Sequence, residues 1–162
     1  MSNKTCVLVL ENLRSVENTA SIFRTAEGLG VNKIICVGTT PTPVDRFGRK
    51  RADFAKVSLG AEEFVEWEYC RAEDLESKIQ DLRIKGFNII ALEQGPKATK
   101  LKDFNAGNLE KFALIVGNET EGVSLEAMKA SETIIEIPML GKKESLNVSV
   151  STGIALYALM VE

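Results

Sequence analysis

Short hydrophobic runs alternate along the chain with longer segments in which hydrophobic residues recur every three or four positions. Runs of this length, several of them rich in β-branched residues, are typical of buried β-strands. We therefore predict six strands, at residues 6–11, 33–38, 63–69, 87–93, 112–117 and 133–138.

The segments between these runs have the period of a helix. We predict helices over residues 17–30, 71–86 and 124–131, and a last helix that follows Asn147. Strands that alternate with helices indicate an α/β fold with a mostly parallel sheet flanked by helices. In such sheets ligands bind in the loops beyond the carboxyl ends of the strands.

Composition limits the function classes that the chain can serve. A chain of 162 residues, 44% of them hydrophobic, is expected to form a single domain over residues 1–162. The formal net charge of −3 offers no general attraction for nucleic acid or an anionic membrane, so any RNA-binding surface must be a local patch. No stretch has the layout of a signal peptide or of a membrane span, and we expect a cytoplasmic protein.

The residues that usually bind metals or act as nucleophiles are scarce. The chain has no histidine, and Cys6, Cys36 and Cys70 lie far apart. This pattern argues against the usual zinc sites and against a Cys/His nucleophile. We expect reduced cysteines that pack as small hydrophobic residues, and no metal centre.

Three of the predicted strands end in loops with unusual chemistry. The sequence GNETEG spans residues 117–122, where two glycines permit close backbone approach and Glu119 offers a carboxylate. A plain turn with a solvated Glu119 is the simpler explanation. The sequences QGP and MLGKKESLN follow two other strands, and the three loops together can offer backbone N–H and C=O groups to an adenine and a ribose.

The last helix is preceded by Ser145, Leu146 and Asn147. Ser and Asn are both favoured N-cap residues, so one of them can serve simply to start the helix. A helix start also presents unpaired N–H groups and a partial positive charge to a ligand.

Three segments carry a resemblance to a known family. NTASIFRTAEGLGV, ALIVGNETEGVS and IEIPMLGKKESLNVSVSTGIALY resemble, in this order, the three motifs of the SpoU/TrmH branch of the SPOUT RNA methyltransferases. The set is far more specific than any one motif. It implies a SPOUT-type domain with a C-terminal deep trefoil knot. Many relatives carry an extra RNA-binding domain, and from the size of this chain we expect the catalytic domain alone. The motif set also implies a homodimer, S-adenosylmethionine (SAM) as methyl donor and 2′-O-methylation of a ribose.

The resemblance also implies which residues form the site. The positions that bind SAM, mostly through the backbone, correspond to Leu92, Glu93, Gly117, Ile137 and Leu146. The catalytic positions correspond to Asn18, Arg24, Glu119, Ser145 and Asn147. Ala20 stands where the family usually has glycine.

The chemistry of ribose methylation restricts the role of Arg24. A 2′-hydroxyl is a poor nucleophile at neutral pH, so an enzyme must align it with the SAM methyl group and manage one proton. The resemblance implies that Arg24 acts as the base, although arginine stays protonated in proteins. Holding a phosphate or the developing 2′-oxyanion is the role that agrees better with a charged guanidinium.

The segment DRFGRKRADFAK is the candidate RNA surface. Phosphates favour arginine and lysine, and Phe47 can add a stacking face, whereas a solvated loop is the alternative explanation. The expected RNA-binding residues are Arg14, Arg46, Arg49, Lys50 and Arg51.

We therefore predict a SAM-dependent RNA ribose 2′-O-methyltransferase that acts on tRNA. One alternative is the same reaction on rRNA, and another is a non-catalytic module that binds RNA or SAM. The complete set of catalytic-type residues argues against the second alternative, and the lack of GxGxxG after the first strand argues against a dinucleotide-binding domain.

Overall fold

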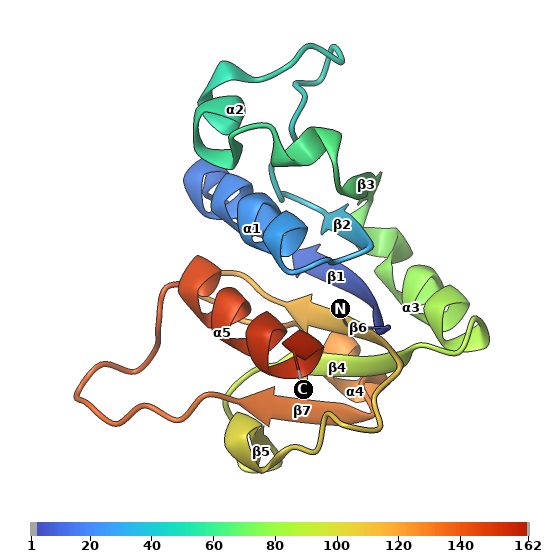
Figure 1. Ribbon diagram of the computed structural model, residues 1–162, viewed down its shortest axis with the longest axis vertical. Coiled ribbons are helices and arrows are strands. Elements are labelled where there is room, and N and C mark those ends of the chain that lie inside the picture. The colour runs from blue at the N-terminus through green and yellow to red at the C-terminus, as the bar shows by residue number, and fades with distance from the viewer. Residues whose placement is uncertain (1–2, 162) are drawn as a thin grey trace.

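A computed structural model of the chain describes residues 3–161. Within them, seven parallel strands form one sheet in the order β3-β2-β1-β6-β4-β7-β5 (Figure 1). The strands are β1 (Thr5–Glu11), β2 (Lys33–Val37), β3 (Glu66–Cys70), β4 (Asn88–Leu92), β5 (Thr99–Lys100), β6 (Lys111–Val116) and β7 (Thr133–Glu136). This sheet confirms the predicted α/β class, while the C-terminal trefoil knot stays a prediction.

Helices cover both faces of the sheet (Figure 1). They are α1 (Val16–Gly28), α2 (Ala52–Ser58), α3 (Leu75–Ile84), α4 (Leu125–Ala130) and α5 (Val148–Val161). Short 3-10 helices span Ala61–Glu63, Ala72–Asp74 and Leu101–Asp103. None of the helices in residues 3–161 is long and apolar enough to cross a membrane.

The side chains of β1 alternate between two hydrophobic cores, because successive residues of a strand point to opposite faces of the sheet. Leu8 and Leu10 pack in a core with α1, α2 and α5, whereas Val7 and Val9 pack in a core with α3 and α4. Burial on both faces explains why the strands read as continuous hydrophobic runs in the sequence.

Three elements differ from the sequence prediction. Strand β3 starts at Glu66 rather than at residue 63, because Ala61–Glu63 form a 3-10 turn. The hydrophobic pattern does not predict α2, whose one large buried side chain, Phe54, packs edge-on against Phe23 at 5.1 Å between ring centroids. It does not predict β5 either, since β5 is a polar two-residue strand at the sheet edge.

The three cysteines are unpaired and buried. Burial raises the pKa of the Cys36 thiol to about 12 and also raises the pKa of the Cys6 and Cys70 thiols. Because only the thiolate is a good nucleophile, these side chains are unreactive at neutral pH.

Candidate active site

A cavity of about 820 Å³ lies beyond the carboxyl ends of β6, β4 and β7, which are neighbours in the sheet. Parallel strands end at the same edge, so the loops that follow them meet there although they are distant in sequence. The wall consists of residues 92–94, 116–123, 136–137, 139 and 144–148, together with Asn18, Leu125, Met128 and Ser151. The cavity is large enough for a nucleoside-sized ligand.

The loop after β6 is held in shape by the buried side chain of Asn118. Its Oδ1 accepts hydrogen bonds from the backbone N–H groups of Thr120 (2.8 Å) and Glu121 (3.1 Å). Its Nδ2 donates to the backbone oxygen of Asn12 (2.8 Å), just beyond β1. The amide therefore provides hydrogen-bond partners for N–H groups that a tight turn leaves unpaired. It also fixes the loop to the end of the neighbouring strand.

Two glycines let the ends of this loop come together. A Cβ at Gly117 would lie 2.2 Å from the carbonyl carbon of Gly122, and one at Gly122 would lie 2.0 Å from Oε2 of Glu93. Gly122 also has a φ of +72°, which other residues rarely adopt. Only glycine fits either position.

Glu93 joins the loop after β4 to the loop after β6. Its Oε2 accepts a hydrogen bond from the N–H of Val123 (2.9 Å), and its Oε1 accepts one from Gln94 (3.0 Å). Both carboxylate oxygens are thus used to hold backbone, so the primary effect of this side chain is to position the wall of the cavity.

A chain of hydrogen bonds links the first and last helices to this wall. Asn147 Nδ2 donates to Asn18 Oδ1 at 3.1 Å, and Asn18 Nδ2 donates to Glu119 Oε1 at 3.4 Å. The three side chains come from the three sequence motifs and meet at the cavity.

Helix capping positions the two asparagines. Asn147 Oδ1 accepts from the N–H of Ser149 at 2.8 Å, so Asn147, and not Ser145, is the N-cap of α5. Ser15 caps α1 by accepting from the N–H of Asn18 at 3.0 Å. Since the cap uses only Oδ1 of Asn147, its Nδ2 is able to donate to Asn18 at the cavity.

The structure brings most of the predicted site residues together. All five predicted SAM-binding residues line the cavity, as do Asn18, Glu119, Ser145 and Asn147. Arg24 does not line it. Its side chain lies exposed on α1 and makes no hydrogen bond or ion pair with another residue in the described part of the chain.

The cavity is strongly acidic. Its lining includes five glutamates and, among residues 3–161, no lysine or arginine. Three of the five are not among the predicted site residues but adjoin them in the sequence: Glu121, Glu136 and Glu144. This charge favours a ligand with cationic groups and disfavours a phosphate inside the cavity.

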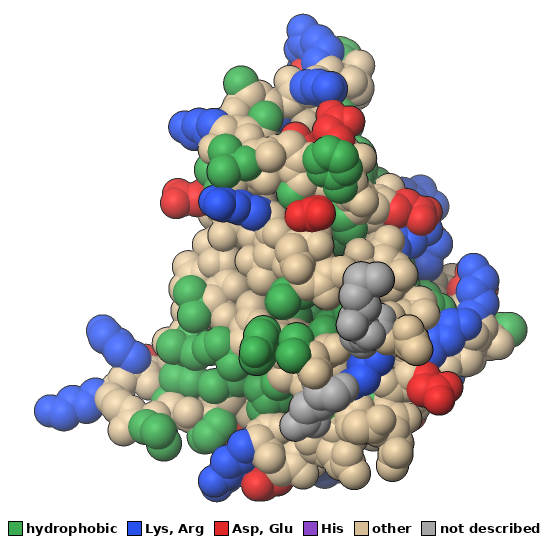
Figure 2. Space-filling view, in the orientation of Figure 1, with side chains coloured by type: hydrophobic (Ala, Val, Ile, Leu, Met, Phe, Trp, Pro, Cys, Tyr) green, Lys and Arg blue, Asp and Glu red, His purple; other side chains and the backbone are tan. Residues whose placement is uncertain are grey.

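The predicted RNA-binding segment consists of an ordered loop and the first turn of α2, and the basic side chains of the loop lie at the top of the molecule in Figure 2. Backbone N–H groups of Arg49 and Phe47, together with the Arg49 side chain, hold the pKa of the Asp45 carboxyl below its usual value. Arg51 pairs with Asp53 at 2.8 Å and Lys50 with Glu63 at 3.0 Å.

Arg46 and Phe47 form the exposed end of this loop. The guanidinium carbon of Arg46 lies 4.8 Å from the centroid of the Phe47 ring, and that of Arg49 lies 5.0 Å from it. Phe47 thus supports two arginines rather than presenting a bare face for stacking. Arg14, the other predicted RNA contact, has a guanidinium nitrogen 3.9 Å from a carboxylate oxygen of Glu121, which lines the cavity.

A second groove of about 510 Å³ runs between α1 and α5. Ser21 and Thr25 of α1 form one side of it. Val150, Ile154 and Tyr157 of α5 form the other, with 42 to 60% of each residue exposed. Figure 2 shows the hydrophobic side chains that gather over α5.

The family to which these motifs belong is identified by comparison. A family model described as the SpoU rRNA Methylase family matches residues 5–157, which include every residue named around the cavity. The chain belongs to this family. The recognition of a SpoU/TrmH protein from three motifs is thereby confirmed.

Two curated relatives illustrate the likeness. An uncharacterized tRNA/rRNA methyltransferase of Mycobacterium tuberculosis is 34% identical over 152 residues, 93% of this chain and 50% of that protein. A tRNA (guanosine(18)-2′-O)-methyltransferase of Borreliella burgdorferi is 27% identical over 153 residues, 94% of this chain and 65% of that protein. The chain spans half to two thirds of the length of these relatives.

The fold is shared with solved structures. The crystal structure of an AdoMet-bound rRNA methyltransferase from Sinorhizobium meliloti superimposes with a TM-score of 0.83 at 24% identity. The match covers 98% of this chain and 56% of that chain.

Replacing Gly117 with alanine tests the close approach that shapes the cavity. Gly117→Ala should lower the free energy of unfolding by about 1–3 kcal/mol, because the new methyl group collides with backbone. Gly141→Ala is the matched control, since a Cβ there meets nothing within 4 Å. Urea unfolding of both variants measures the difference, and equal stability would show that the loop relaxes freely.

Proposed function

We propose that this chain carries a SAM-dependent methyltransferase that acts on a ribose 2′-hydroxyl of RNA. The observation that carries the proposal is the convergence of all three SpoU motifs on one cavity. When bound there, SAM would supply an electrophilic methyl group on its sulfonium.

The residues around the cavity fit such a cofactor. Leu92, Ile137 and Leu146 provide apolar sides and backbone polar groups for a nucleoside. Gly117 carries no side chain, so the backbone of its loop can approach the ligand closely. The surrounding carboxylates attract the sulfonium and the amino group of SAM.

The hydrogen-bond chain from Asn147 through Asn18 to Glu119 would position the ribose. Amide and carboxylate groups at the cavity mouth can bind ribose hydroxyls and hold the 2′-oxygen in line with the methyl group. Ser145, on the same wall, adds a hydroxyl to the reaction site.

Arg24 would act in the site of a second protomer. The α1–α5 groove exposes apolar side chains of α5 opposite Ser21 and Thr25, which belong to the same helix as Arg24, and covering the groove in a homodimer would bury them. The partner's Arg24 could then reach the cavity and hold the developing 2′-oxyanion, or a phosphate at the rim of the cavity.

For the RNA, tRNA is the proposed substrate and rRNA the alternative. The Borreliella relative, which is named for one nucleotide of tRNA, supports tRNA. The loop before α2, with Arg46 and Phe47 at its exposed tip, would contact phosphates. Arg46 is the cation of this loop that is most available to RNA, since Arg49, Lys50 and Arg51 have carboxylate partners.

Methyl transfer from isotopically labelled SAM to unmodified tRNA and rRNA tests the proposal. Label should enter tRNA as a 2′-O-methylated nucleoside after digestion. Label in rRNA ribose would favour the alternative substrate, and label on a base would contradict the assigned reaction. Normal SAM binding without transfer to either RNA would favour a non-catalytic module.

Mixing two inactive variants tests the shared site. Arg24→Ala and Glu119→Ala should each abolish transfer while Arg24→Ala still binds SAM. Mixed dimers would contain one complete site, so an equimolar mixture should recover about one quarter of wild-type activity. Recovery is measured after subunit exchange. No recovery, from variants shown to be dimers, would place Arg24 in its own protomer's site or outside catalysis.

Arg46→Ala should weaken RNA binding and lower the slope of log binding constant against log salt by about 1, because one phosphate contact is lost. Lys129→Ala, an exposed cation on α4, is the control. RNA titrations of both variants at several salt concentrations measure the two slopes. Identical slopes would show that the loop does not contact RNA.

A further inference from the structure

We propose that Lys142 and Lys143 bind the RNA phosphates beside the nucleotide that is to be methylated. They lie on the loop that joins β7 to α5, at one rim of the cavity. The inference rests on the proposed function, and it names the part of this chain that positions the RNA.

The charge of the cavity requires that phosphates stay outside it. A nucleotide within a strand carries a phosphate on each side of its ribose, whereas the cavity is lined by five glutamates. Moving a phosphate among these carboxylates is unfavourable in a site partly screened from water. A ribose that enters the cavity therefore leaves its flanking phosphates at the rim.

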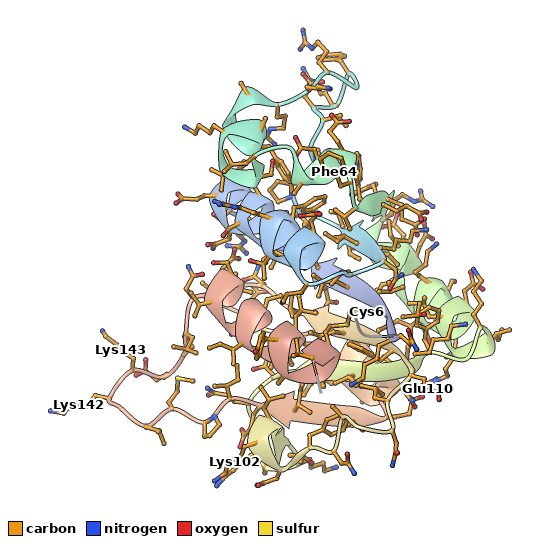
Figure 3. All side chains as sticks on the ribbon, viewed as in Figure 1. Cys6, Phe64, Lys102, Glu110, Lys142 and Lys143 are labelled. Atoms are coloured by element: carbon orange, nitrogen blue, oxygen red, sulfur yellow. The ribbon has the colours of Figure 1, made fainter. Side chains whose placement is uncertain are left out.

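The loop from Ile137 to Asn147, here called the rim loop, has some residues in the cavity wall and others outside it. Met139 and Glu144 line the cavity, while the residues between them do not. At its tip Leu140 is 97% exposed, so the tip is not packed against the described part of the chain. Figure 3 shows Lys142 and Lys143 at this tip, pointing away from the body of the molecule.

The charges of these two lysines are available. Neither forms an ion pair or hydrogen bond with another residue in the described range, whereas Arg14 and most cations of the loop before α2 face carboxylates. Ammonium groups on long, mobile stems suit phosphates whose position varies with RNA conformation. Phosphate contacts of this kind set the register of a nucleic acid without reading its sequence.

The same loop also links RNA binding to the reaction site. It begins at Ile137 and ends at Asn147, so both of its ends belong to the wall of the cavity. Holding a phosphate at its tip would fix the distance between the ribose and the residues that act on it. Lys142 and Lys143 are thus positioning residues, and their loss should affect RNA binding more than the chemical step.

The double variant Lys142→Ala/Lys143→Ala tests this role. Its KM for RNA should rise roughly tenfold at moderate salt, and its salt slope should fall by about 1–2, as expected for two lost phosphate contacts. Its kcat and its affinity for SAM should be unchanged. Lys142→Arg/Lys143→Arg should restore KM, since guanidinium also binds phosphate.

The matched control is Lys85→Ala/Lys102→Ala, which removes the same charge from two exposed lysines that lie outside the loop between β7 and α5. An equal loss in both variants would show a nonspecific charge effect and overturn the inference. So would an unchanged KM and salt slope in the rim variant. If wild-type protein transfers no methyl group at all, the proposed function fails, and direct RNA binding by the two variants still decides the role of the lysines.

Discussion

The close approach of Gly117 to Gly122 is the contact on which the rest of the site depends. Because neither residue has a side chain, the loop after β6 can close on itself and lie against Glu93. That closure joins two strand-end loops into one wall and brings Glu119 within hydrogen-bonding distance of Asn18. The wall of the cavity therefore depends on glycine at positions 117 and 122.

Helix capping and the candidate chemistry use the same side chains. Asn147 starts α5 through Oδ1 and holds Asn18 through Nδ2, so the direction of the helix and the geometry of the site cannot vary independently. The N-termini of α1 and α5 both point at the site, and their partial positive charge offsets part of the surrounding glutamate charge.

Charge separates the two substrates of the proposed reaction. Carboxylates line the cavity, where a cationic cofactor would bind, whereas available cations stand on its rim and on the loop before α2. A protein with a net charge of −3 would thus bind an anionic polymer through local cations that lie outside the acidic cavity. A uniformly basic surface is not required.

Sequence alone determined the α/β class, six of the strands and the three strand-end loops that line the cavity, because buried strands and glycine-rich loops leave local patterns and the three motifs are specific. Tertiary structure decided what depends on distant partners. Phe54 joins α2 to the core by packing beside Phe23 of α1, and Glu63 forms an ion pair with Lys50 from a separate element. The cap at Asn147 rather than Ser145, and the separation of Arg24 from the cavity, follow from where the folded chain turns, which no local pattern records.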